Sequence, residues 1–123
     1  MTRLLGAHVS VAGGLDNAFA RGLESHCTAL QIFTKNANRW QGKPISNDDA
    51  IAFQKAWQKS GIGPVIAHDA YLINLASPKQ DVWEKSKAAL RDELLRCAQL
   101  GITGLVMHPG AHLGTGVETG VER

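Results

Sequence analysis

Short apolar runs recur at fairly even intervals along the chain and alternate with longer amphipathic stretches. They span Leu4 to His8, Ala29 to Phe33, Pro64 to His68 and Gly104 to His108. Each run leads into a polar, turn-forming segment. Runs of this length between helical patterns are typical of buried parallel strands, whose carboxyl ends open into loops. We therefore predict four parallel strands.

The stretches between these runs have helical periodicity. The apolar stripes consist of Leu15, Ala18, Phe19 and Leu23 in the first, Ala50, Phe53 and Trp57 in the second, and Trp83, Leu90, Leu94 and Cys97 in the third. Ser46 and Gly61 bound the second stretch, and Ser77-Pro78 and Gly101 bound the third. Serine caps free amides, proline fits a first turn, and glycine closes a helix in the left-handed conformation. These patterns predict three helices that each lay one face on the sheet.

The alternation of strands and helices predicts an α/β fold with right-handed crossovers, either a closed barrel or an open doubly wound sheet. Either fold brings His8, Lys35, His68 and His108 to the same edge. A closed (β/α)₈ barrel takes about 250 residues, whereas this chain has 123. We therefore interpret residues 1–123 as an incomplete (β/α)₈ barrel domain, the N-terminal half of a TIM barrel, truncated before its C-terminal half.

The composition, 44% hydrophobic and 20% charged, is that of an ordinary globular domain. A formal charge of +2 is too small to indicate nucleic-acid or membrane binding by its total alone. The sequence contains neither an apolar export signal nor a stretch long enough to span a membrane, so we expect a cytoplasmic protein with no membrane partner. Cys27 and Cys97 fit no paired motif and are expected to be reduced, structural thiols.

The histidines that close two of the predicted strands, His68 and His108, are the main metal candidates. Neighbouring strand axes are only about 4.8 Å apart, so two imidazoles on one rim can share a metal ion. His112 follows a Pro-Gly turn and could orient His108. His8 ends the first strand and, like His112, could support the metal ligands without binding the metal itself. Either the free amides of its loop face an anion, or His8 is a hydrogen-bonded residue that packs the barrel mouth.

A polar loop runs from Phe33 to Trp40 and combines cations, amides and an indole. Lys35 and Arg39 can neutralise phosphates, and Asn36 can bond to phosphate or sugar. Trp40 can wedge or stack between bases. The alternative is a solvated loop whose tryptophan fills a hydrophobic gap.

The loop after His68 contains Tyr71, Leu72 and Asn74. A solvated loop seldom places tyrosine and leucine side by side, so exposure of Tyr71 and Leu72 would favour insertion into a base stack. Burial would instead make them part of the core under the next helix. Asn74 is a further candidate contact to DNA.

Four motifs occur together in the order and spacing of the endonuclease IV family. They are Gly-Ala-His-Val-Ser with a following Gly-Gly, Phe-Thr-Lys-Asn with a later Trp, His-Asp-x-Tyr-Leu-Ile-Asn-Leu, and His-Pro-Gly-x-His-Leu. From Leu5 to about Gly114 the chain resembles the first half of the barrel of these zinc-dependent apurinic/apyrimidinic endonucleases of base-excision repair. The resemblance implies a barrel with three zinc ions that hydrolyses double-stranded DNA 5′ to an abasic site, leaving a 3′-hydroxyl.

The resemblance also implies residue roles. His68 and His108 resemble two ligands of a single zinc ion, and Tyr71 and Leu72 resemble the side chains that fill the duplex where the abasic nucleotide is flipped out. The family commonly has an arginine at the position of Asn38, whereas in this chain the arginine is the next residue, Arg39. The other zinc ligands of the family pattern are carboxylates and histidines beyond the end of this sequence, so we expect the 123 residues alone to be inactive.

Two other functions stay open. Metal-dependent sugar isomerases or epimerases use similar barrels with histidines and carboxylates at the same rim, although the cationic loop from Lys35 to Trp40 is unlike a sugar pocket. The chain could also be a non-enzymatic truncated product.

Half a barrel leaves open sheet edges, and Ile32, Ile66 and Val106, or their alternating neighbours, would lose the opposite wall of the core. We therefore expect self-association.

Overall fold

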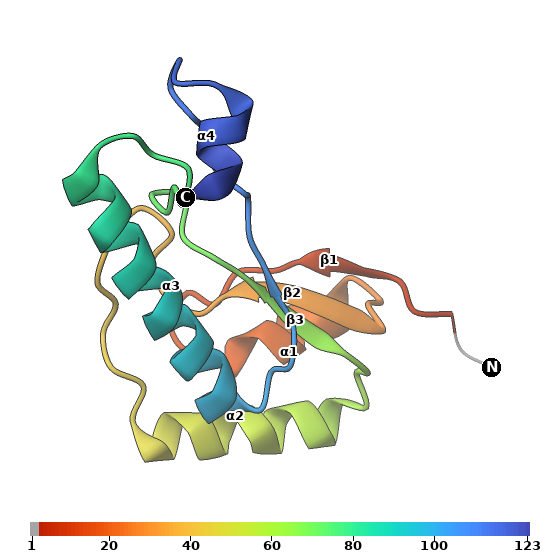
Figure 1. Ribbon diagram of the computed structural model, residues 1–123. Coiled ribbons are helices and arrows are strands. Elements are labelled where there is room, and N and C mark those ends of the chain that lie inside the picture. Colours follow the sequence, from red (N-terminus) through yellow and green to blue (C-terminus); the bar gives the residue numbers. More distant parts are fainter. Residues whose placement is uncertain (1–2) are drawn as a thin grey trace.

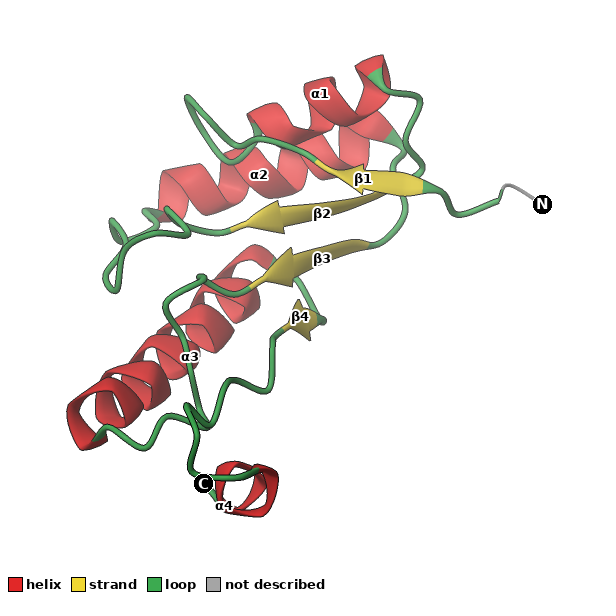
Figure 2. Cartoon of the chain, turned by 90° about the horizontal axis from the view of Figure 1, so that it is seen from above, coloured by secondary structure: helices red, strands yellow, loops and turns green. Residues whose placement is uncertain are grey.

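The structure is a computed structural model that describes residues 3–123. Its elements in chain order are β1 (Gly6–His8), α1 (Asn17–Glu24), β2 (Ala29–Phe33), α2 (Asn47–Ser60), β3 (Val65–His68), α3 (Gln80–Leu100), β4 (Leu105–Val106) and α4 (Val117–Glu122). The strands form one parallel sheet in the order β1-β2-β3-β4 (Figure 2). The predicted parallel α/β sheet is confirmed. Its sequential order is that of a barrel wall, because a doubly wound sheet reverses direction at a switch point.

Three helices, α1, α2 and α3, cover one face of this sheet (Figure 1). Leu30, Ile32 and Val65 point into the helical layer and are buried in the main core with Phe19 and Phe53. Because side chains alternate along a strand, the residues between them point to the opposite face, which none of the helices in residues 3–123 covers. We call this the open face.

Helix α2 begins and ends where the sequence predicts. The hydroxyl of Ser46 accepts a hydrogen bond from the backbone amide of Asp49 at 3.0 Å. Gly61 ends the helix in the left-handed conformation, with φ of 72°. Ala50 and Phe53 are buried on its inner face, as the apolar stripe indicates.

Helix α3 differs from the prediction in its start and in its buried stripe. Lys79, not Ser77, is the N-cap. The hydroxyl of the fully buried Ser77 instead accepts from the Lys79 amide at 3.2 Å, which forms a turn before the helix. Leu94 is exposed, whereas Glu93 and Arg96 are buried. The inner face of α3 is partly polar because it packs against the loop that follows β2 as well as against the core.

Strands β1 and β4 are more exposed than the buried strands that the sequence predicts. Gly6–His8 is exposed along its whole length, since it lies at an edge of the sheet. Ile66 and Val106 lie 37% and 39% exposed, as expected for an uncovered wall. On β2 the alternating neighbours of Ile32 take this place instead, because Ile32 points to the helices and is fully buried.

Cys27 and Cys97 are both buried and free, which agrees with their prediction as reduced structural thiols. Across residues 3–123, no helix has the length and apolar character needed to cross a membrane.

Candidate metal centre and nucleic-acid interface

A row of rings lies along the carboxyl edge of the sheet, at the positions where the strands end. The centroid of the Phe33 ring is 4.4 Å from that of His8 and 5.6 Å from that of His68. His108 follows β4, and its ring centroid is 5.1 Å from that of His68. Parallel pairing produces this row, since Phe33 is in register with His68 and His68 with Val106. The predicted meeting of His68 and His108 is thus present in the structure.

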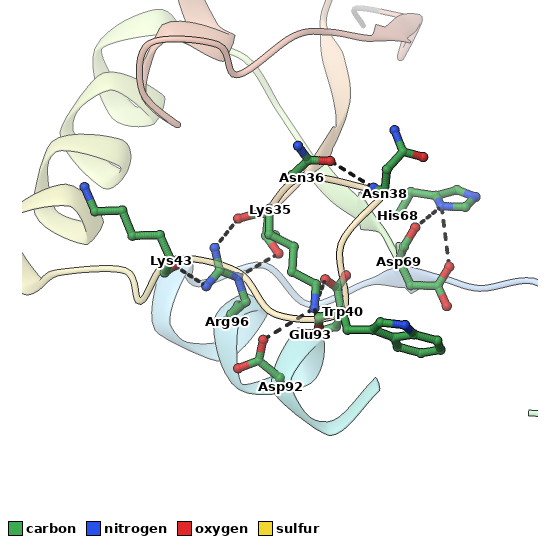
Figure 3. Close-up of polar contacts among 11 residues, drawn as sticks. Lys35, Asn36, Asn38, Trp40, Lys43, His68, Asp69, Asp92, Glu93 and Arg96 are labelled. Carbon is green, nitrogen blue, oxygen red and sulfur yellow. Dashed lines mark hydrogen bonds and ion pairs between the residues drawn. The ribbon is translucent and has the colours of Figure 1, made fainter. Parts of the chain in front are cut away.

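Backbone contacts orient the imidazole of His68. Its Nδ1 lies 2.8 Å from the backbone carbonyl oxygen of Asp69 and 3.6 Å from the Asp69 carboxylate (Figure 3). A carbonyl oxygen only accepts, so Nδ1 carries the hydrogen and Nε2 keeps a free lone pair. This tautomer is the one that binds a metal ion through Nε2.

Asp69 is a functional candidate that the sequence analysis missed. Its carboxylate is buried with Oδ1 3.6 Å from Nδ1 of His68, and Oδ2 has no hydrogen-bond partner among residues 3–123. Burial raises the pKa of Asp69, and the nearby His68, His108 and Lys35 partly oppose this rise. The available signal was an acid placed directly after a strand-end histidine.

The histidine pair fits part of a zinc site. Zinc prefers imidazole nitrogen and takes four ligands in a tetrahedral arrangement. In the part of the chain that the structure describes, no three His, Cys, Asp or Glu side chains gather closely enough to hold a metal ion. His68 and His108 could therefore supply two of the four ligands of such an ion.

The other two candidate histidines make contacts of their own. The amide of Gln31 donates to Nδ1 of His8 at 2.8 Å, and burial together with the charge of His68 lowers the pKa of His8. His8 is therefore a hydrogen-bonded residue, as the second of the two alternatives expects. His112 accepts hydrogen bonds at Nδ1 from the amides of Gly114 and Gly116 at 3.1 and 3.2 Å. It organises the turn before α4, which differs from the predicted role of orienting His108.

The cations of the β2–α2 loop (residues 34–46) lie in different environments. Lys35 is buried, and its ammonium donates to the carbonyl of Trp40 at 2.8 Å and lies 3.6 Å from Glu93 (Figure 3). The expectation that Lys35 neutralises a phosphate does not fit this placement, because its charge is turned toward α3. Asn36 and Arg39 are exposed and remain available for contacts.

Trp40 is half-buried and packs against a small apolar cluster that contains Ala70, Ile73 and Ala89. This agrees with the alternative of a tryptophan that fills a hydrophobic gap. The packing also fixes the β2–α2 loop against the elements next to it.

The loop after β3 presents Tyr71 to the solvent. Tyr71 is 64% exposed, whereas Leu72 is half-buried. The backbone amide of Tyr71 donates to the carbonyl of Ala37 at 2.8 Å, so the two loops form one continuous surface. The exposure of Tyr71 is the outcome that favours insertion into a base stack over a core role.

Asn74 uses its side chain to hold another loop. Its Oδ1 accepts from the amides of Ala76 and Ala111 at 3.1 and 2.9 Å, and its Nδ2 donates to the carbonyl of Ala111 at 3.0 Å. A side chain added at Gly110, where φ is 117°, would meet Oδ1 of Asn74. Asn74 therefore braces the segment that carries His108, a role that the sequence alone does not indicate.

The sequence of the chain matches a known family and several known proteins. Residues 19–123 match the family described as "Xylose isomerase-like TIM barrel". A protein of Geobacter sulfurreducens named "Probable endonuclease 4" is 50% identical over 123 residues, which cover 100% of this chain and 42% of that protein. A protein of the same name from Chloroflexus aggregans is 55% identical over 118 residues, or 96% of this chain and 41% of that protein.

A solved structure gives the same result at the level of the fold. The crystal structure of endonuclease IV from Thermus thermophilus superposes with a TM-score of 0.80 at 34% identity, and the match covers 87% of this chain and 41% of that one. The chain thus spans about two fifths of the length of these relatives. On these matches, the chain belongs to the xylose isomerase-like TIM barrel family, and the relatives that it resembles here are endonuclease IV proteins.

Proposed function

We propose that this chain forms part of a zinc-dependent endonuclease IV of base-excision repair. The reaction is hydrolysis of the phosphodiester 5′ to an abasic site in double-stranded DNA, leaving a 3′-hydroxyl. The observation that carries this proposal is the approach of His68 and His108, whose ring centroids are 5.1 Å apart, next to an exposed Tyr71. The names of the relatives support a nuclease over a sugar isomerase.

The residues at the carboxyl edge have two roles in this proposal, metal binding and DNA binding. His68 and His108 would hold a zinc ion, and the carbonyl of Asp69 keeps Nε2 of His68 free to bind it. Bound zinc supplies an activated water and stabilises charge at the phosphate. Tyr71, with Leu72 beside it, fills the space left by the missing base, a step made easier because no base pair has to be broken there.

Contacts to the DNA backbone come from the exposed part of the β2–α2 loop. Asn36 offers an amide and Arg39 a guanidinium, which are groups that position a protein on phosphates. Two residues support that loop on its buried side: Trp40 packs against the apolar cluster, and Lys35 pairs with Glu93. The partner proposed for this surface is a duplex with an abasic site.

The 123-residue chain by itself is proposed to be inactive and to bind zinc weakly. Two imidazoles supply only two of the four ligands of a tetrahedral zinc ion. Both are neutral, so no negative charge balances that of the metal. The open face of the sheet is proposed to drive self-association of the chain, since Ile66 and Val106 are exposed there. The two free, buried thiols fit the reducing environment of the cytoplasm.

Zinc uptake by the dialysed chain tests the metal site. We expect weak uptake that a His68→Ala/His108→Ala double variant abolishes. The matched control is His26→Ala, because His26 is exposed in the turn between α1 and β2, at the opposite edge of the sheet. Unchanged uptake in the double variant would place the metal elsewhere.

DNA binding is tested on the same preparations. Fluorescence anisotropy with a duplex that contains one abasic analogue should show tighter binding than with the undamaged duplex. Equal affinity for both duplexes would contradict recognition of the abasic site. Metal-dependent nicking by a preparation free of host nucleases would contradict the proposed inactivity of the isolated chain.

A further inference from the structure

Arg96 connects both ends of an irregular segment, residues 34–43, to α3 (Figure 3). Its Nε donates to the Thr34 hydroxyl at 3.2 Å, and its Nη2 donates to the Thr34 carbonyl. Its Nη1 donates to the carbonyl of Lys43 at 2.7 Å. The guanidinium is planar and rigid, so these three bonds set the separation between the two ends of the segment. Arg96 is 7% exposed and does this from within the protein.

The middle of the same segment is held by Lys35. Its ammonium donates to the Trp40 carbonyl and lies near the buried carboxylate of Glu93, at 3.6 Å. Gly42 packs over the stem of Lys35, where an added Cβ would be 2.7 Å from the Lys35 Cβ and 3.4 Å from the Arg96 Cζ. Residues 34–43 contain no helix or strand. Their shape therefore depends on the contacts with Arg96 and Glu93 of α3, together with a local turn in which the amides of Asn38 and Arg39 donate to Asn36.

This segment carries the exposed groups of the proposed DNA surface. Asn36 and Arg39 lie on it, and the carbonyl of Ala37 accepts the hydrogen bond from the backbone amide of Tyr71 at 2.8 Å. A change in the position of the segment would therefore also move the backbone of Tyr71. Preorganised contact groups bind more tightly because less conformational freedom is lost on binding.

We propose that Arg96 is a positioning residue for DNA binding. It fixes residues 34–43 in the shape that presents Asn36 and Arg39, and through Ala37 it fixes the place of Tyr71. This inference rests on the proposed function of the chain. Arg96 acts from the helical side of the segment and does not itself touch DNA.

The test uses Arg96→Lys, which keeps the charge but cannot make the three bonds in one plane. Arg91→Lys is the matched control, because Arg91 is exposed on the same helix. A second variant, Thr34→Val, nearly preserves volume and removes only the hydroxyl that accepts from Nε.

Two measurements separate positioning from a general loss of structure. Hydrogen exchange should become about tenfold faster or more for the amides of residues 36–42 and of Tyr71 in Arg96→Lys, with little change in α2. Affinity for the abasic duplex should fall about tenfold while zinc uptake at His68 and His108 stays the same. Thr34→Val should show a smaller effect in the same places, and Arg91→Lys none.

Three results would overturn the inference. One is unchanged exchange of residues 36–42 in Arg96→Lys. Another is faster exchange across the whole chain in both Arg96→Lys and Thr34→Val, since that describes a general structural role. The third is a loosened segment with undiminished DNA affinity. A wild-type chain that does not bind the duplex contradicts the proposed function itself, and the exchange data then report separately whether Arg96 shapes the segment.

Discussion

The ring of Phe33 meets the ring of Tyr71 edge-on, with centroids 5.2 Å apart and planes at 75°. Phe33 ends β2, and its ring centroid lies 5.6 Å from that of His68, with the two planes at 77°. One side chain therefore braces both the candidate metal ligand and the candidate DNA wedge. Edge-to-face pairs contribute about 0.5–1.5 kcal/mol beyond the area they bury, so Tyr71 is held in place while most of it stays exposed.

Replacing Tyr71 with alanine should weaken binding to the abasic duplex far more than it weakens folding. The exposed ring contributes little to the core, so we expect a loss of about 1 kcal/mol or less in the free energy of unfolding. Urea denaturation and anisotropy on the same samples measure the two effects. Tyr71→Phe is the control and should keep most of the affinity. A large loss of stability with unchanged affinity would assign Tyr71 to the core.

Glu93 should make stability depend on pH in an unusual direction. Burial raises the pKa of Glu93 above its ordinary value of 4.5, although Lys35 pulls that pKa down. The folded state then keeps a proton that the unfolded chain has already released. The contribution of Glu93 to the free energy of unfolding is therefore greatest below the unfolded pKa and is lost as pH rises through the folded pKa.

The Glu93→Gln variant removes this titration. We expect the free energy of unfolding to fall less between about pH 4 and 7 in Glu93→Gln than in the wild type, as urea denaturation can measure. Glu84→Gln is the control, since Glu84 is exposed on the same helix. Parallel pH profiles for wild type and Glu93→Gln would show that this carboxyl does not shape the stability curve.

The thiol of Cys97 should be unreactive in the folded protein. Burial, with a further contribution from Glu93, raises the pKa of Cys97 to about 11. Because the thiolate is the reactive form, reaction with a disulfide reagent near neutral pH should be slow until the chain unfolds. A Cys27→Ala variant isolates Cys97 for this measurement, with and without urea. Equal rates in both conditions would contradict the burial of Cys97.

Self-association should depend on the open face of the sheet. Ile66 and Val106 are exposed there, and lysine at both positions should shift the chain toward the monomer in sedimentation experiments. Ile51→Lys is the matched control, because Ile51 is 50% exposed on α2. A wild-type chain that stays monomeric at high concentration would contradict this prediction, as would an equal effect of the control.

The sequence by itself determined the parallel sheet and the place of the histidine pair. Apolar runs that end in His68 and His108 lead to both conclusions, because parallel strands align their carboxyl ends at one edge. Local interactions also determine the two ends of α2. The Ser46 hydroxyl accepts a hydrogen bond from a backbone amide in the first turn, and Gly61 adopts the left-handed conformation that ends the helix. These features depend on neighbours along the chain or on a general rule of strand pairing.

Only the tertiary structure decided which polar side chains hold loops and which face the solvent. Lys35 and Arg39 are both cations of one loop, yet Lys35 is buried because Glu93 from α3 lies 3.6 Å from its ammonium. Arg96 likewise finds its partners on Thr34 and Lys43, far away in the sequence. A long charged side chain can reach either solvent or a distant backbone carbonyl, and the choice depends on partners that arrive only when the chain folds.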